Sequence, residues 1–368
     1  MTKSLRFVGL DVHKDSITIA VAEEGREPAY VYAEIPNDWG ALRRKLSRLA
    51  VKSELRCCYE AGPCGYGLYR KMRDAKIACV VVAPSLVPVK SGNRVKTDRR
   101  DAKKLAHFLR SGDLTEIFVP DEEAEAVRDL ERAREDAKNS ERAARHQLGK
   151  FLLRHGRRFE GANWTQKHLG WVRRQKFDQQ AQQRVLTDYL KTVEDAGQRE
   201  KQLTEDLAEL IQHTKLYPLI RALQAFRGIR LITAVTIAAE LVDLKRFSSA
   251  RQLMAFLGLV PSEHSSGETQ HRGRITRAGN KHLRRVLVES AWSYHYQPNM
   301  SKAIRKRNEG VAPGVQRLAW KAQQRLHKRL YHLIRKGKTP QKAITAVARE
   351  LTGFVWAVGQ EPAWLAEE

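Results

Sequence analysis

Apolar residues are concentrated in three short runs near the start of the chain, at residues 5–12, 16–23 and 28–35, and the second run alternates polar and apolar positions. Alternation with a period of two is typical of β-strands that bury one face. The links between the runs are short, and the second contains the polar turn Glu24-Gly25-Arg26. Short links join neighbouring strands that run in opposite directions, so we predict an antiparallel meander of three strands.

The pattern then changes to alternating helices and strands. Residues 38–50 and 65–74 are helix candidates, whereas 55–59 and 76–83 are short apolar runs typical of buried strands. A strand, a helix and a strand in succession predict a parallel βαβ unit. Three antiparallel strands followed by such a unit is the order of a ribonuclease-H-like domain, so we predict this α/β fold for residues 1–120.

After residue 120 the pattern acquires a period of seven. One heptad register runs through residues 130–151 and a second through 186–207. Heptad spacing predicts two antiparallel helices of a coiled-coil arm over residues 121–215, or a contact between two copies of the chain. Charged residues interrupt the registers, which leaves open a helical hairpin that packs only on its own chain.

The remaining residues, 216–368, have mainly helical patterns. Residues 217–244 resemble a helix-hairpin-helix unit, in which a tight turn lets backbone N–H groups meet a DNA phosphate. The turn reads Arg227-Gly228-Ile229-Arg230, with Arg230 at the usual position of a second glycine. We therefore expect this hairpin either to contact DNA or to serve only as a packing element of a mainly α-helical domain.

The charge of the chain narrows the class of partner. Its 368 residues include 67 Lys and Arg against 42 Asp and Glu, which gives a net charge of +25. This excess favours polyanions, either nucleic acid or an anionic membrane surface. The chain has no apolar run of about 18 residues and its first residues lack the order of a signal peptide, so we expect a cytoplasmic protein without a membrane partner.

Four acidic residues are expected to meet at one edge of the predicted sheet. Asp11 lies in the first strand in an apolar setting, and Glu60 ends the fourth strand, which neighbours the first in a ribonuclease-H-like sheet. An acid in such a setting is costly unless it is paired or binds a metal. Asp98 and Asp101, three residues apart, would share a helix face and complete the set.

A set of four carboxylates predicts a metal site. Carboxylate oxygens suit Mg²⁺, for which Mn²⁺ is a possible substitute. One or two such ions polarise a phosphodiester and activate the oxygen that attacks it. The alternative is that each acid is only a helix cap or half of a salt bridge.

Basic residues flank these acids and recur later in the chain. Between residues 142 and 178 they are interleaved with aromatic residues, which suits contacts with a nucleic-acid backbone and stacked bases but also fits an ordinary core at a hairpin tip. Residues 271–338 contain 18 Lys and Arg against two acids. The predicted nucleic-acid contacts are Lys96, Arg99, Arg100, Arg157, Arg158, Arg272, Arg274, Arg277, Lys281, Arg284 and Arg285.

A polar loop is predicted at residues 261–269, after an apolar helix. It contains Ser265 and Ser266, with His264 beside them and His271 shortly after. Serine in such a loop is usually a turn residue, and loop histidines are common. Residue type alone therefore predicts neither a serine nucleophile nor a histidine base here.

Five short motifs together resemble the transposases of the insertion sequence 110 family, including its IS1111-like branch. Their order and spacing extend over nearly the whole chain. They are Gly9-Leu-Asp11-Val-His-Lys14, Tyr59-Glu60-Ala-Gly62, Lys96-Thr-Asp98-Arg-Arg-Asp101-Ala102, Gly258-Leu-Val-Pro261 followed by Ser266-Gly267, and Arg272-Gly-Arg274 followed by Ala278-Gly279.

The resemblance implies an N-terminal RuvC-like domain with an Asp-Glu-Asp-Asp metal set. The matching positions are Asp11, Glu60, Asp98 and Asp101. It also implies a coiled coil that supports a homo-oligomer, either a dimer or a tetramer.

The same resemblance implies a C-terminal domain with a catalytic serine, which aligns with Ser266, or with Ser265 if the alignment slips by one position. Family members excise and insert their element in double-stranded DNA, guided by a structured noncoding bridge RNA. A phosphoserine link would conserve the phosphodiester energy, so that strands rejoin without ATP. Because the serine and the acids are more than 150 residues apart in sequence, a composite site is expected, within one chain or between protomers.

Other functions fit part of this pattern. A RuvC-like endonuclease or junction resolvase would use the same acids with water, and Ser266 would be structural. A nonenzymatic nucleic-acid binder would keep the acids for structure alone. An actin-like ATPase or sugar kinase is disfavoured, because its phosphate-binding glycine motifs are missing and its substrates do not account for the charge of +25.

Overall fold

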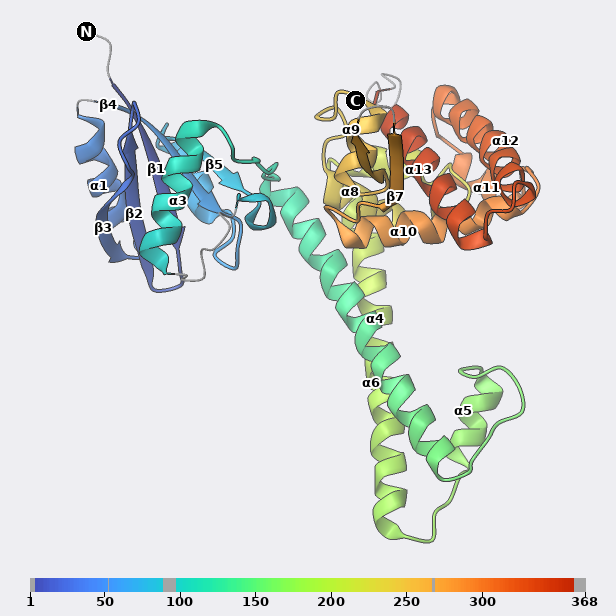
Figure 1. The fold of residues 1–368 in the computed structure, drawn as a ribbon. Helices are drawn as coiled ribbons and strands as arrows, with labels where there is room; N and C mark the ends of the chain where they lie inside the picture. The colour runs from blue at the N-terminus through green and yellow to red at the C-terminus, as the bar shows by residue number, and fades with distance from the viewer. Residues whose placement is uncertain (1–3, 52, 89–96, 267–268, 361–368) are drawn as a thin grey trace. The chain divides into compact units, whose positions relative to one another are not determined.

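The computed structural model describes residues 4–51, 53–88, 97–266 and 269–360, without the side chains of 264, 265, 270 and 272. The chain divides into two compact units, Met1–Val119 and Pro120–Glu368. Figure 1 shows the fold of each unit. None of the described helices is long and apolar enough to cross a membrane.

The first unit is built on one mixed sheet with the strand order β3-β2-β1-β4-β5. Its strands are β1 (Ser4–Val12), β2 (Ser16–Glu23), β3 (Tyr30–Pro36), β4 (Ser53–Glu60) and β5 (Ala78–Val82). β2 pairs antiparallel with β1 and β3, whereas β4 pairs parallel with β1 and β5. The meander and the parallel βαβ unit predicted from the sequence are therefore confirmed.

Helices cover both faces of this sheet. They are α1 (Trp39–Ala50), α2 (Gly67–Asp74) and α3 (Asp98–Ser111), with a short 3-10 turn, η1 (Pro84–Leu86). Leu42 and Leu46 of α1 and Met72 of α2 are buried in one core with alternate residues of the strands. α3 packs on the opposite face, where Ala102 and Ala106 are buried.

Gly9 allows α3 to lie unusually close to β1. A Cβ atom at Gly9 would collide with the backbone oxygen of Ala102 and the backbone nitrogen of Ala106. Any larger residue would push the helix away from the sheet. The absence of a side chain at this position therefore sets the distance between α3 and the end of β1.

The second unit contains a long helical arm. It consists of α4 (Glu122–Arg154), α5 (Gln166–Arg173) and α6 (Gln180–Leu210), and α4 and α6 lie side by side (Figure 1). Heptad positions of both helices, among them Ala144, Phe151, Leu186 and Val193, are buried in one cluster. Within the chain the two helices thus form a hairpin; a contact between copies stays a prediction.

Charged residues that interrupt the heptad pattern pair with each other inside this hairpin. The side chain of Arg134 in α4 is only 3% exposed, and its Nη1 lies 3.1 Å from Oε1 of Glu200 in α6. Its Nη2 lies 3.1 Å from Oε2 of Glu135. An unpaired charge would be costly at this depth, and these ion pairs satisfy it.

The rest of the second unit is mainly helical, as predicted, and buries the base of the arm in its largest core. Its elements are η2 (Ile211–His213), α7 (Tyr217–Leu223), α8 (Leu231–Leu241), α9 (Ala250–Phe256), β6 (Pro261–Ser266), β7 (Thr269–Ile275), α10 (Lys281–Ala291), η3 (Trp292–His295), α11 (Lys302–Asn308), α12 (Pro313–Arg335) and α13 (Pro340–Val358).

The turn between α7 and α8 packs against the same unit. Gly228 has a positive φ of 85°, and a Cβ atom there would collide with the backbone oxygen of Ser290. The guanidinium of Arg227 donates to the backbone oxygens of Tyr296, Gln297 and Asn299 at 2.7–3.1 Å. The turn therefore has a packing role, and its contact with DNA stays a prediction.

The predicted polar loop at residues 261–269 is wrong for residues 261–266 and 269, which belong to strands, and residues 267 and 268 lie outside the described residues. Residues 261–266 form β6, which pairs antiparallel with β7. The segment is polar throughout, so no apolar alternation marks it as a strand. Backbone hydrogen bonds to the neighbouring strand, rather than burial of one face, hold it extended.

Candidate catalytic site

The sheet of the first unit brings two of the four predicted acids to one edge. β1 and β4 are parallel neighbours in which Leu10 is the partner of Tyr59. Asp11 and Glu60 each follow one of these residues, so they occupy corresponding positions at the carboxyl ends of the two strands. Both residues are half-buried.

The close packing of α3 adds the other two acids. Asp98 and Asp101 lie in the first turn of α3, where the unpaired N–H groups of a helix favour negative charge. Asp11 follows Gly9 by two residues and so points to the same face of the sheet, the one that α3 covers.

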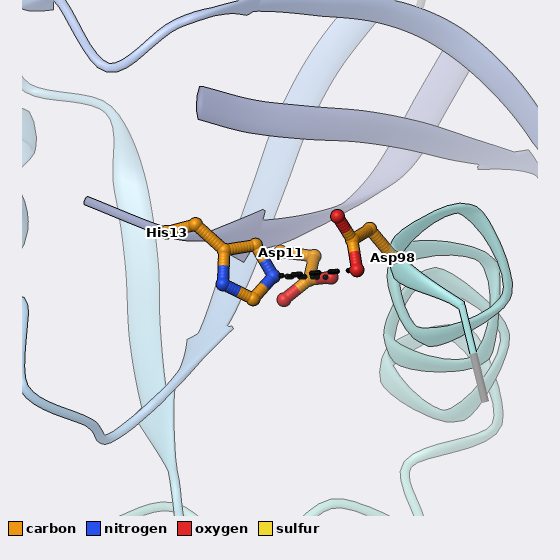
Figure 2. A group of neighbouring side chains, drawn as sticks. All are labelled: Asp11, His13 and Asp98. Atoms are coloured by element: carbon orange, nitrogen blue, oxygen red, sulfur yellow. Dashed lines mark hydrogen bonds and ion pairs between the residues drawn. The ribbon is translucent and has the colours of Figure 1, made fainter. Parts of the chain in front are cut away.

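A histidine joins the acids at this edge. Figure 2 shows one nitrogen of the His13 imidazole facing the carboxylates of both Asp11 and Asp98. Its Nε2 lies 3.3 Å from Oδ2 of Asp11 and 3.5 Å from Oδ1 of Asp98. One ligand atom from each of the three residues falls within 4.8 Å of the others, which is close enough to share one ion. Within the described ranges, Glu60 and Asp101 lie outside this group.

The raised pKa of Asp11 indicates that the effects of burial and of neighbouring negative charge outweigh the effect of His13 at this site. Burial raises the pKa of Asp11, and the negative charges of Asp98 and Asp101 raise it further, although His13 acts in the opposite direction. A carboxylate in such surroundings is stabilised by a cation. The oxygen and nitrogen donors fit a divalent metal ion, because carboxylates bind hard cations and imidazole is a common ligand as well.

Sequence reasoning missed His13, which it treated only as part of a motif. The signal was present in the spacing, because His13 follows Asp11 by only two residues and comes directly after the end of β1 at Val12. The turn after β1 also fixes its backbone. The His13 N–H donates to the backbone oxygen of Ser16 at 2.9 Å, and Nδ2 of Asn37 donates to the His13 oxygen at 2.7 Å.

Ser266 lies in the second unit, at the end of β6. It is exposed and pairs in register with Thr269 of β7. The hairpin is joined to the body by hydrogen bonds from Thr276 N to the oxygen of Val260 at 2.9 Å and from Arg277 N to that of Gly258 at 3.1 Å. The side chain of Ser265, the alternative nucleophile, lies outside the described part of the chain.

Comparisons with known proteins place both regions in one family. A model described as "Transposase" matches residues 8–156, which include Asp11, Glu60, Asp98 and Asp101. A second model, "Transposase IS116/IS110/IS902 family", matches residues 220–305, which include Ser266.

Curated relatives agree over almost the full length. The chain is 47% identical to the "Putative transposase y4qE" of Sinorhizobium fredii, over 96% of this chain and 88% of the relative. It is 30% identical to the "Transposase for insertion sequence element IS1533" of Leptospira borgpetersenii, over 90% and 97%. The chain belongs to the IS116/IS110/IS902 family of transposases. It is also 25% identical to the "Transposase for insertion sequence element IS1111A" of Coxiella burnetii, over 78% of each chain.

Membership confirms the resemblance seen in the five motifs and has three consequences. The DEDD transposase model covers the first unit from residue 8 and continues into α4, and this type of domain has a RuvC-like fold, which indicates a divalent metal. The transposase is a DNA-processing enzyme. It therefore binds DNA, as its charge of +25 suggested.

The basic residues predicted near the acids and at the arm tip differ in their surroundings. Arg99 and Arg100 are exposed in the first turn of α3, and Arg99 Nη2 lies 3.5 Å from Oε2 of Glu34. At the arm tip Arg157 donates to the backbone oxygen of Lys176 at 3.0 Å, while Arg158 is exposed. Lys96 lies outside the described residues.

The basic residues that follow β6 fall into two groups, those that are exposed and those that have partners inside their own unit. Arg274, Arg277 and Lys281 are exposed. In contrast, Arg284 donates to the backbone oxygens of Leu257 and Ala278 at 2.9 and 2.8 Å.

Arg285 is likewise engaged inside its unit, because its Nη2 lies 2.7 Å from Oε1 of Glu135 and its Nη1 lies 3.1 Å from Oε1 of Glu289. Arg284 and Arg285 therefore support the structure, which makes them weaker candidates for contacts with DNA. The side chain of Arg272 lies outside the part of the chain that the structure describes.

Proposed function

We propose that this transposase excises and inserts its element by recombination through a covalent phosphoserine intermediate. Ser266 is the proposed nucleophile, and Asp11, Glu60, Asp98 and Asp101 are the proposed ligands of Mg²⁺, for which Mn²⁺ can substitute. The observation that carries the proposal is the meeting of Asp11 and Asp98 at one sheet edge, in a domain of the transposase family.

The proposed reaction exchanges one phosphate ester for another. The hydroxyl oxygen of Ser266 forms a bond to the scissile phosphorus, the bond from phosphorus to one deoxyribose oxygen breaks, and the departing strand takes up a proton as a free hydroxyl. The bound ion would supply charge neutralisation at the phosphate. Reversal of the step by a hydroxyl of another strand rejoins DNA without ATP. The proposal requires Ser266 and the acids to act on the same phosphate.

We further propose that a structured noncoding RNA from the element guides the reaction by base pairing. The protein would then hold nucleic-acid backbones without reading every base. The exposed basic residues Arg158, Arg274, Arg277 and Lys281 support contacts of this kind. In this proposal the transposase has a RuvC-like domain (1–120), a coiled-coil arm (121–215) that supports a dimer or tetramer, and a C-terminal domain (216–368).

A second candidate function is a metal-dependent nuclease that uses water as the nucleophile. The observation that favours it is that Asp11, His13 and Asp98 come together entirely within the first unit. Such an enzyme would need no serine, and Ser266 would be only the last residue of a strand.

A recombination assay distinguishes the two functions. It contains the full chain, DNA with the element ends, the flanking noncoding RNA and Mg²⁺, and its products are separated on a denaturing gel. We expect wild type to give a protein–DNA adduct that is absent from Ser266→Ala and present in the matched control Ser262→Ala. Cleavage that persists in Ser266→Ala but is lost in Asp11→Ala would contradict the phosphoserine mechanism and support the nuclease.

A further inference from the structure

The second unit exposes aromatic side chains that its core does not use. Trp292 is 43% exposed, Tyr296 is 63% exposed and Tyr331 is 41% exposed. Large aromatic side chains are normally buried, and a group of exposed ones commonly marks a binding surface. We call the group formed by Trp292, His295, Tyr296, His327 and Tyr331 the aromatic surface.

Contacts between η3 and α12 make this group continuous. The phenol of Tyr331 donates to the backbone oxygen of His295 at 3.0 Å. The ring centroids of His295 and Tyr296 are 3.7 Å apart, and those of His327 and Tyr331 are 4.8 Å apart. Trp292 and His295 are three residues apart in a 3-10 helix, where side chains at this interval lie on the same side.

The backbone beneath the aromatic surface is firmly held. Arg227 donates to the backbone oxygens of Tyr296, Gln297 and Asn299. Tyr294, between the exposed rings, is fully buried and fixes η3 to the core. The exposed rings are thus presented from a rigid support, which lowers the entropy lost when a ligand binds.

The charged residues around these rings indicate which class of molecule the aromatic surface binds. Lys328, Tyr331 and Arg335 are exposed at intervals of three and four residues, so they share one face of α12. Residues 292–335 contain ten Lys and Arg and a single acid, Glu309. Protein interfaces are typically depleted in lysine, whereas surfaces for single-stranded nucleic acid combine aromatic rings with positive charge.

We propose that the aromatic surface binds an unpaired segment of nucleic acid. Bases stack on the exposed rings of Trp292, Tyr296 and Tyr331, and Lys328 and Arg335 contact the phosphates. Every base has a stacking face, so binding of this kind is tolerant of sequence. The inference rests on the proposed function in one respect, since strand exchange and an RNA guide both supply unpaired segments.

Binding is tested without catalysis, in EDTA, so that the result does not depend on the metal site or on Ser266. Fluorescein-labelled dT12, rU12 and a 12-base-pair duplex are titrated with the full chain, and anisotropy gives each dissociation constant. We expect Trp292→Ala, Tyr296→Ala and Tyr331→Ala each to weaken binding of dT12, rU12 or both by about fivefold or more. Binding of the duplex should change by less than about twofold.

The matched control is Tyr30→Ala in the first unit, because Tyr30 is 42% exposed, much like Tyr331. It should leave all three dissociation constants unchanged. Tyr331→Phe keeps the ring but loses the hydrogen bond to His295, so near-normal binding by this variant would separate stacking from a structural effect. Circular dichroism establishes that every variant is folded.

Photo-crosslinking gives a second readout. A dT12 or rU12 probe with one 5-iodouracil should crosslink to peptides that contain Trp292, Tyr296 or Tyr331, as identified by mass spectrometry. Unchanged affinity of the three ring variants for both single strands would overturn the proposal. A change in oligomeric state without a change in affinity would also overturn it, because the surface would then be a contact between copies. Loss of recombination with normal oligonucleotide binding would instead count against the proposed chemistry alone.

Discussion

The acids and the serine of this transposase are supported in different ways. Asp11 lies one residue before the end of a strand that has neighbours on both sides, and the backbone of α3 packs directly against Gly9. Ser266 ends a strand of a two-stranded hairpin and is exposed. A metal site needs several ligands in a fixed geometry, which a packed sheet provides, whereas a nucleophile has to present a single oxygen. Under the proposed function, we therefore expect variants near Asp11 to disturb the arrangement of the acids, and a variant at Ser266 to remove one hydroxyl without disturbing its surroundings.

The largest expected effect comes from Asp11→Asn, which removes a charge and keeps the size of the side chain. Loss of several kcal/mol of metal-assisted stabilisation should lower the rate of strand cleavage roughly 10³-fold. Single-turnover cleavage assays measure the rate, and calorimetric titration with Mn²⁺ measures metal binding. Ser266→Ala should abolish the adduct but bind Mn²⁺ as wild type does. Normal Mn²⁺ binding by Asp11→Asn would contradict the proposal that Asp11 is a metal ligand, and the variants at Asp11 and Ser266 would then not differ in metal binding.

A second prediction concerns the support of the serine hairpin. α10 follows β7 closely, and its His282 Nε2 lies 3.2 Å from Oε2 of Glu131 in α4. The hydroxyl of Thr236 donates to Oε1 of Glu131 at 2.8 Å. Glu131 is only 1% exposed, so this network joins the arm to the helix after the hairpin.

Glu131→Gln should lower the free energy of unfolding by about 2 kcal/mol, because it removes the buried charge that accepts from Thr236 and pairs with His282, although Arg134 keeps its pairs with Glu135 and Glu200. Chemical denaturation measures the loss, and Mn²⁺ binding at the acids of the first unit should not change. The exposed Asp129→Asn, also on α4, is the matched control and should have an effect below about 0.5 kcal/mol.

The effect of Glu131 also depends on pH. Burial raises the pKa of Glu131, but hydrogen bonds from His282 and Thr236 oppose it. With the positive charges of His282 and Arg134 added, the pKa falls below its ordinary value of 4.5. A lowered pKa in the folded chain stabilises it above pH 4.5, and this contribution is lost as the pH falls through the folded value. Denaturation curves of wild type and Glu131→Gln should therefore converge in acid, and a constant difference would contradict this explanation.

Sequence reasoning succeeded where a residue's position follows from the order of strands. Asp11 and Glu60 were placed together because parallel neighbours end at the same edge, and the sheet has that order. It failed for the hairpin of Ser266, since a polar two-stranded ribbon has no buried face to produce alternation. It also could not show that Arg284 and Arg285 would be engaged inside their unit, because charge alone does not separate internal ion pairs from contacts with DNA.

Gly9→Ala tests whether packing of α3 positions the acids. The added methyl group would collide with the backbone of α3, so we expect a loss of about 2 kcal/mol of unfolding free energy and weaker Mn²⁺ binding. Gly67→Ala is the matched control, because a Cβ atom there meets nothing within 4 Å. A variant that is destabilised but binds Mn²⁺ normally would show that α3 does not set the geometry of the acids.

The smallest expected effect is that of His13→Ala. His13 contacts both Asp11 and Asp98 and opposes the rise in the pKa of Asp11, so its loss should increase the repulsion between these two carboxylates. We expect Mn²⁺ affinity and the rate of strand cleavage each to fall about tenfold, less than for Asp11→Asn because the carboxylates stay in place. Lys14→Ala, adjacent and exposed, is the control and should retain both. Cleavage that falls in His13→Ala while Mn²⁺ affinity stays normal would assign the imidazole to the DNA substrate instead of the metal ligands.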